Sequence, residues 1–113
     1  MTIDAQQVKQ RIGKAIARRR LACDLTQDQV AEHLNIGSEA VSRIERGLVE
    51  PSIVRLFELA ELFQCATTDL LQESSVRKDD QIEEANKLLS MLSNDDRETV
   101  MKMLEVFVAT RRR

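Results

Sequence analysis

The chain has 113 residues, of which 42% are hydrophobic and 32% charged, and its formal net charge is -2. This length accommodates one small domain with an appendage, and it excludes a protein with a large catalytic cleft. Three aromatic residues and a single proline form a composition that favours helices over a sandwich of short strands. We therefore expect an all-α protein.

The basic residues are concentrated near the N-terminus. The net charge provides no global positive field that would draw the protein to nucleic acid or to an acidic membrane. Residues 9–20 nevertheless contain no acid and carry these cations: Lys9, Arg11, Lys14, Arg18, Arg19 and Arg20. Any attraction to an anionic partner is therefore local.

Several classes of protein are excluded by what the chain lacks. No apolar run approaches the roughly 20 residues that cross a bilayer, and no signal-peptide layout opens the chain, so we expect a cytoplasmic protein with no membrane partner. Cys23 and Cys65 match no zinc or redox spacing, and His33 is the only histidine. We predict no metal site, no cofactor and no structural disulfide. No nucleophile with a base, phosphate loop or paired-carboxylate site can be assembled, so an enzyme is not expected.

The apolar pattern predicts a first helix from about Ala5 to Ala22. Its inward residues recur with the period of an amphipathic helix: Val8, Ile12, Ala15 and Ile16. Thr26 lies three residues before Gln29, the spacing of a capping box. A second helix is therefore expected from about Gln27, with an inward face made of Val30, Ala31 and Leu34.

A tight turn separates the second helix from a third. Asn35 tolerates the left-handed conformation that ends a helix, and Gly37 or Ser38 can open the next one. The third helix is predicted to run to Arg46, with Gly47 placed to terminate it.

Two further elements complete the N-terminal part. Pro51 and Ser52 form a short loop before a fourth helix, whose inward residues are Leu56, Leu59, Ala60 and Phe63. Thr67 or Thr68 is expected to cap a last short turn that ends in Leu70 and Leu71. The following stretch, QESSVRKDD, is polar and has no apolar period. We therefore predict a domain over residues 1–72, a linker over 73–80 and a C-terminal unit over 81–113.

The C-terminal unit carries two apolar stripes, Ile82, Ala85, Leu89 and Leu92, then Val100, Leu104, Phe107 and Val108. Between them Ser93 lies three residues before Asp96, which places a cap and negative charge at a helix start and predicts an antiparallel helical pair. Two helices cannot bury both stripes between themselves as a stable unit, so a partner surface is required. The predicted dimer or partner interface consists of Leu89, Leu92, Val100, Leu104, Phe107 and Val108.

The third predicted helix has two different faces. Ser38, Glu39, Ser42 and Arg43 lie on one side, and Val41 and Ile44 lie on the other. A protruding helix with such a polar face can enter the major groove of DNA, which is about 12 Å wide, and reach the base edges.

Residues 25–47, followed by Pro51 and residues 56–71, resemble the helix-turn-helix domain of the Cro and lambda-repressor type, the XRE family. The resemblance is carried by Arg20, LTQ at 25–27, Ala31, SRIERG at 42–47 and PS at 51–52. It implies five helices, with the recognition helix at residues 38–46. The implied function is sequence-specific binding of double-stranded operator DNA by a transcriptional regulator. A dimer is favoured, since two-fold-related half-sites lie about 34 Å apart. Repression is favoured over activation because no activation surface is identifiable in the sequence.

The same resemblance assigns roles to individual residues. Ser38, Glu39 and Arg43 match the positions that read bases, with Ser42 nearby. Arg43 can hold guanine with two hydrogen bonds, and Glu39 can accept one from a cytosine amino group. Gln27 matches a phosphate contact at the start of the second helix. Their charge, and not the resemblance, makes Arg18, Arg19 and Arg46 further candidates for phosphate contact, and an ordinary solvated surface is the alternative for Arg18 and Arg19. Arg20 and Glu45 match an ion pair that braces the first helix against the third.

The loop after Gly47 departs from the family. It reads LVE where many relatives carry basic residues, which predicts weaker backbone affinity unless the basic first helix and Arg46 compensate. This loop and the acidic balance leave one alternative open. The chain could be a protein-interaction module, an antitoxin or co-regulator, that holds a protein partner through its C-terminal helices.

Overall fold

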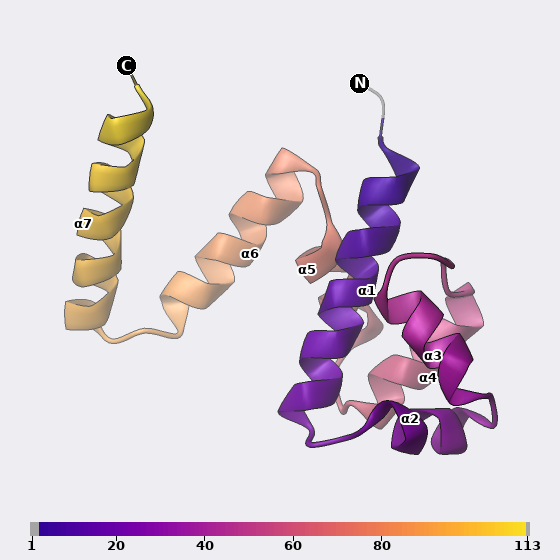
Figure 1. Cartoon of the computed structure of the whole chain (residues 1–113). Coiled ribbons are helices and arrows are strands. Elements are labelled where there is room, and N and C mark those ends of the chain that lie inside the picture. Colours follow the sequence, from indigo (N-terminus) through magenta and orange to yellow (C-terminus); the bar gives the residue numbers. More distant parts are fainter. Residues whose placement is uncertain (1–2, 113) are drawn as a thin grey trace. The chain divides into compact units, whose positions relative to one another are not determined.

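The computed structural model describes residues 3–112. All regular structure in this part of the chain is helical, which confirms the predicted all-α class (Figure 1). The helices are α1 (Ala5–Ala22), α2 (Gln27–Leu34), α3 (Ser38–Glu45), α4 (Ile53–Leu62), α5 (Thr67–Ser74), α6 (Lys78–Ser90) and α7 (Asn94–Arg111). The chain divides into two compact units, residues 1–81 and 82–113.

The predicted boundaries of the first three helices are confirmed, except that α3 ends at Glu45, one residue before its predicted end, and has Arg46 as its C-cap. The Thr26 hydroxyl accepts from the Gln29 backbone N–H at 3.1 Å, and the Gln29 amide oxygen accepts from the Thr26 N–H at 2.8 Å. Asn35 ends α2 in the left-handed conformation, and Gly47, with φ of 76°, follows the end of α3. Both ends of the helix-turn-helix pair are therefore set by local backbone chemistry.

The core of the first unit lies among α1 to α5. Its buried hydrophobic residues are Ile16, Val30, Ala31, Val41, Ile44, Leu56, Leu59, Ala60, Phe63 and Leu70. The inward face predicted for α4 is confirmed, and so are Val30 and Ala31 on α2. Leu34 on α2 and Val8 and Ile12 on α1 are only partly buried. This core supports α3 from behind.

The prediction for α5 was wrong in two respects. The helix begins at Thr67, and its N-cap is Ala66 rather than a threonine, with Asp69 Oδ2 accepting from the Ala66 N–H at 3.0 Å. It also continues beyond Leu71 to Ser74. The Asp69 carboxylate supplies the capping bond that a threonine hydroxyl was expected to make, and burial of Leu70 and Ser74 favours the additional turn.

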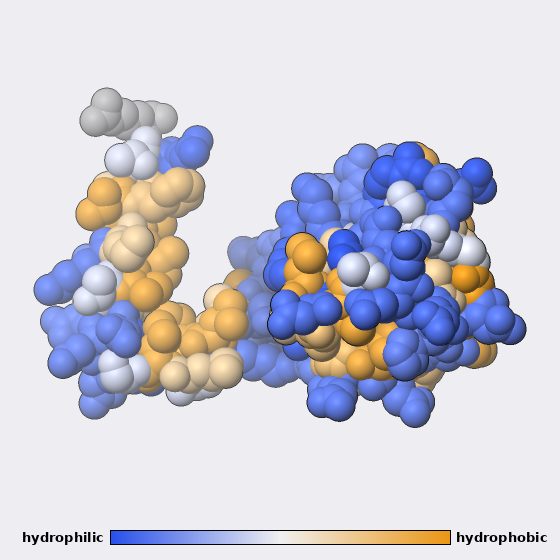
Figure 2. Space-filling view, turned by 60° about the horizontal axis from the view of Figure 1, so that its bottom comes forward, coloured by the Kyte–Doolittle hydropathy of each residue, from blue (hydrophilic) through white to orange (hydrophobic). Residues whose placement is uncertain are grey.

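The second unit consists of the rest of α6 and of α7. Ser93 caps α7 as predicted, accepting from the Asp96 N–H at 3.2 Å. The two helices diverge from the turn between them (Figure 1), and neither contains a buried residue. Figure 2 shows apolar side chains gathered on the surface of this unit, and those of α7 include Met101, Met103, Leu104, Val106, Phe107 and Val108. The described residues of this unit therefore do not bury their own apolar side chains.

None of the helices within residues 3–112 combines the length and the apolar character that a membrane-spanning helix requires.

Candidate nucleic-acid interface

Helix α3 separates an anchored face from an exposed one. Val41 and Ile44 are buried in the core, while Ser38, Glu39 and Arg43 are exposed and Ser42 is partly buried. The side chains predicted to read bases thus share the outward side of α3. Because the inner face is packed, the helix can present this outward side without rearranging.

Close packing of α1 against the end of α3 depends on Gly13. A Cβ at this position would lie 2.5 Å from the Ile44 carbonyl oxygen, far inside van der Waals contact. In the first turn of α1, Gln6 Nε2 donates to the Gly47 carbonyl at 3.2 Å. The C-terminal end of α3 is therefore held by α1 through backbone proximity as well as side chains, a contact that the sequence analysis did not anticipate.

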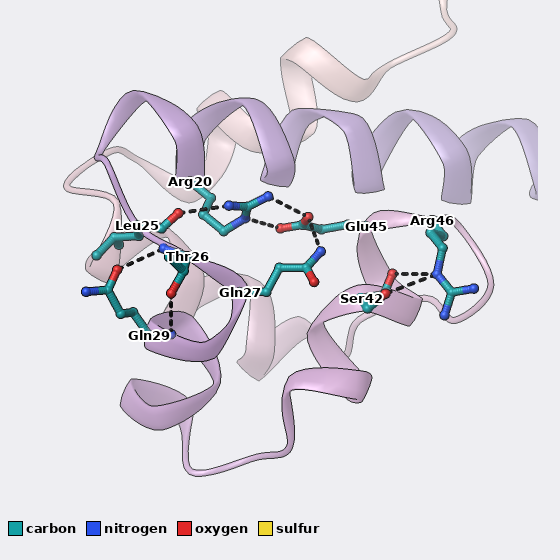
Figure 3. Close-up of polar contacts among 8 residues, drawn as sticks. All are labelled: Arg20, Leu25, Thr26, Gln27, Gln29, Ser42, Glu45 and Arg46. Atoms are coloured by element: carbon teal, nitrogen blue, oxygen red, sulfur yellow. Dashed lines mark hydrogen bonds and ion pairs between the residues drawn. The ribbon is translucent and has the colours of Figure 1, made fainter.

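Arg20 and Glu45 form the ion pair that the resemblance implied (Figure 3). Arg20 Nε and Nη2 donate to the two carboxylate oxygens of Glu45 at 2.7 and 3.1 Å, and Arg20 Nη1 donates to the Leu25 carbonyl at 2.8 Å. The two side chains are only 13% and 6% exposed. The pair therefore links α1 to the end of α3, and Arg20 also links α1 to the segment just before α2.

Gln27, predicted to contact phosphate, also joins this network. Its Nε2 donates to Glu45 Oε1 at 2.9 Å (Figure 3), so its side chain contacts α3. Gln27 can still bind an anion through the backbone, because the N–H groups in the first turn of α2 are not used within the helix.

A second polar network lies on the exposed side of α3. Glu39 Oε1 accepts from Arg43 Nε at 3.4 Å and from Arg46 Nη2 at 3.1 Å. Arg46 Nε also donates to the Ser42 hydroxyl at 3.1 Å (Figure 3). Residues predicted for base and phosphate contact are therefore linked to each other along one helix.

The two arginines before Arg20 have different surroundings. Arg19 Nη2 donates to Glu73 Oε1 at 2.8 Å and is 32% exposed, whereas Arg18 is 66% exposed and its Nη1 lies 4.0 Å from Glu73 Oε2. Partial burial by itself lowers the pKa of Arg19, but the hydrogen bond and charge of Glu73 outweigh it and raise this pKa above its ordinary value. Arg19 therefore joins α1 to α5, and Arg18 has more freedom to meet solvent. Glu73 was not identified from the sequence, because nothing local indicates that it is partly buried.

The part of the loop that follows Gly47 lacks cations, and its apolar side chains are exposed. Leu48 and Val49 point to solvent in this loop, as do Ile53, Val54 and Phe57 in the first half of α4. The positive charge on the exposed side of α3 is therefore that of Arg43 and Arg46.

Comparison with known proteins agrees with these features. A sequence model described as helix-turn-helix matches residues 16–70. The chain is 32% identical over 79 residues to the HTH-type transcriptional regulator ImmR of Bacillus subtilis (strain 168), covering 70% of this chain and 62% of that protein. It is 20% identical over 89 residues to the cryptic phage CTXphi transcriptional repressor RstR of Vibrio cholerae, covering 79% and 80%. The chain thus spans less than two thirds of the Bacillus relative.

Solved structures show the same fold. The clp gene regulator ClgR from Corynebacterium glutamicum superposes with a TM-score of 0.59 at 21% identity, over 74% of this chain and 87% of that one. The apo form of the competence regulator ComR from Streptococcus vestibularis gives 0.54 at 24% identity, over 87% and 33%. Residues 16–70 are therefore similar in sequence to helix-turn-helix proteins, and the described helices share the fold of these solved structures.

Proposed function

We propose that this protein is a sequence-specific DNA-binding transcriptional regulator that acts as a dimeric repressor. The observation that carries the proposal is the presentation of α3, whose inner face is packed in the core and whose outer face exposes Glu39 and Arg43. The names of the two relatives, a transcriptional regulator and a transcriptional repressor, support the same class of function.

Base recognition is assigned to the outward side of α3, with Arg43 as the principal reader and Ser38, Glu39 and Ser42 beside it. A guanidinium that holds guanine O6 and N7 contributes about 1 to 3 kcal/mol of discrimination against another base. Arg43 is exposed and lies on the same side as Ser42 and Arg46, so this contact is sterically open.

Backbone contacts are assigned to Arg18, to Arg46 and to the start of α2 at Gln27. Arg18 is the more exposed of the two neighbouring arginines, whereas Arg19 is already bonded to Glu73. If Arg18 contacts a phosphate, Arg18→Gln should reduce the slope of log affinity against log salt by about 0.9. Arg19→Gln should change this slope less, because its charge is engaged within the protein.

Dimerisation is assigned to residues 81–113, joined by the segment 73–80 to the DNA-binding part at 1–72. Leu104, Phe107 and Val108 are exposed, and Leu89, Leu92 and Val100 are only partly buried. A second copy would cover these side chains and bring two recognition helices to half-sites about 34 Å apart.

The proposal is tested by in-vitro selection of bound duplexes from a random DNA pool at fixed, moderate salt, on the wild type and on Arg43→Ala. A two-fold-related motif that relaxes at one position per half-site in the variant is the expected result. If well-folded wild-type protein enriches no motif, the proposal is wrong.

That second outcome would favour the alternative, a protein-interaction module of the antitoxin or co-regulator kind. Its support is the same uncovered apolar surface of α7, together with the loop at Leu48 and Val49, which carries no cation to hold a phosphate. A protein that copurifies in fixed ratio and is lost on Leu104→Glu would support this reading.

A further inference from the structure

One carboxylate on the recognition helix holds two of the cations that are expected to meet DNA. Glu39 Oε1 accepts from Arg43 Nε at 3.4 Å and from Arg46 Nη2 at 3.1 Å. The three side chains are 66%, 57% and 53% exposed, so this cluster lies at the surface and not in the core. Its charges are therefore available to a ligand, but they are already paired.

This arrangement opposes indiscriminate attraction to phosphates. In the free protein the Glu39 carboxylate partly neutralises the two arginines, and the loop after Gly47 adds Glu50 and no cation. An arginine that turns away from Glu39 to reach a phosphate gives up its bond to that carboxylate. It also leaves that carboxylate near an anionic backbone, where like charges repel.

The free energy lost when Arg43 leaves Glu39 is compensated to different extents by operator DNA and by random DNA. A guanine offers two acceptors in the plane of the Arg43 guanidinium, which replace the Glu39 oxygen fully. A single phosphate oxygen on an unrelated duplex replaces it less well. A group that weakens the wrong complex more than the right one raises specificity without contacting a base.

We propose that Glu39 is a specificity-determining residue that acts through Arg43 and Arg46, restraining both until a matching base edge replaces it. This inference rests on the proposed function, because it requires α3 to be the helix that meets DNA. It replaces direct reading of cytosine as the principal role of Glu39.

The test measures the affinities of Glu39→Gln for the operator recovered by selection and for a random duplex of equal length. Each of two exposed ion pairs typically contributes a factor of about two to five. We therefore expect affinity for the random duplex to rise about fivefold, affinity for the operator to change less than twofold, and the salt slope on the random duplex to steepen by about 0.9. Glutamine preserves the size of the side chain, and thermal melts check that the fold is unchanged.

Two controls separate the restraint from simpler explanations. Glu50→Gln removes the same charge from an exposed residue that has no ion pair among residues 3–112, and it should change affinity for the random duplex less than twofold. In an Arg43→Gln, Arg46→Gln background, Glu39→Gln should have no further effect, because the groups that it restrains are gone.

Three results would overturn the inference. Affinity for the random duplex could stay unchanged in Glu39→Gln, the rise could persist in the double-arginine background, or the selected motif could change at one base in Glu39→Gln. The last of these would mean that Glu39 reads that base. Failure of the proposed function is distinguishable, because it gives no selected motif for the wild type. Even then, one result would support the restraint of the arginines by Glu39. It is a rise in affinity for the random duplex in Glu39→Gln that disappears in the Arg43→Gln, Arg46→Gln background.

Discussion

Arg20 and Glu45, separated by 25 positions in the chain, meet through two hydrogen bonds of 2.7 and 3.1 Å with little exposure to solvent. The contact joins the end of α1 to the end of α3, and Gln27 adds a bond from α2 to the same carboxylate. The recognition helix is therefore positioned by charge as well as by the apolar core. This arrangement makes the pair a structural element that would affect the proposed DNA binding only indirectly.

Loss of Arg20 should destabilise the first unit. Arg20→Ala leaves the Glu45 carboxylate without its principal partner, and breaking a buried pair from one side typically costs about 3 to 5 kcal/mol. Because the pair keeps slight exposure, we expect the lower end, about 3 kcal/mol in urea unfolding followed by circular dichroism. Arg18→Ala, at a mostly exposed neighbour, should stay within about 1 kcal/mol of the wild type. Unchanged melting of Arg20→Ala would remove the bracing role.

A methyl group at Gly13 should force α1 and α3 apart. The Cβ of Gly13→Ala would collide with the backbone carbonyls of Ile44 and Glu45, which cannot swing aside as a side chain can. We expect a loss of at least about 2 kcal/mol in stability, as for other overpacked positions. Gly37→Ala is the matched control, because no atom lies within 4 Å of its added Cβ and its cost should be limited to a poorer N-cap, about 1 kcal/mol or less. Equal melting temperatures for the two variants would contradict the close approach.

Charge on the apolar surface of α7 should dissociate the dimer. Leu104 is 46% exposed within the chain, and Leu104→Glu would place a carboxylate in the proposed interface. We expect the mass in sedimentation equilibrium at micromolar concentration to fall from dimer to monomer. Lys102→Glu, at an exposed neighbour on the same helix, should leave the mass at that of a dimer. A wild-type protein that is strictly monomeric under these conditions would contradict the dimer.

The thiol of Cys65 should react slowly at neutral pH. Burial raises its pKa, and this effect exceeds the opposing effect of the positive charge of Arg19, so the reactive thiolate forms only under more alkaline conditions. Alkylation by iodoacetamide, followed by mass spectrometry on Cys23→Ser, should accelerate at higher pH than in the unfolded chain. Because the folded state holds this proton more tightly, the contribution of Cys65 to stability is present below the unfolded pKa and is lost as the pH rises through the folded value. Equal pH profiles for folded and unfolded protein would contradict the assignment.

The helices themselves follow from patterns that are local in the sequence. A capping box is complete within four residues, and the left-handed end of α2 depends on Asn35 alone. The apolar periods of α2 and α4 point to the core whatever the partner elements are, since each helix has only one face to bury. The motifs of residues 20–52 are local in the same way, and they were sufficient to indicate the similarity to helix-turn-helix proteins that the sequence comparison found over residues 16–70.

Contacts between distant segments could not be predicted in this way. Arg19 and Glu73 are 54 positions apart, and only the packing of α1 beside α5 turns a run of three arginines into one bridge to α5, one exposed cation and one partner for Glu45. Gly13 is unremarkable in the sequence, yet the backbone of α3 approaches it too closely for any side chain. The sharing of Glu39 between Arg43 and Arg46 likewise depends on rotamers, which residue spacing permits but does not select. Periodicity and capping specify where helices begin, end and face, whereas the distances between helices arise only when they pack together.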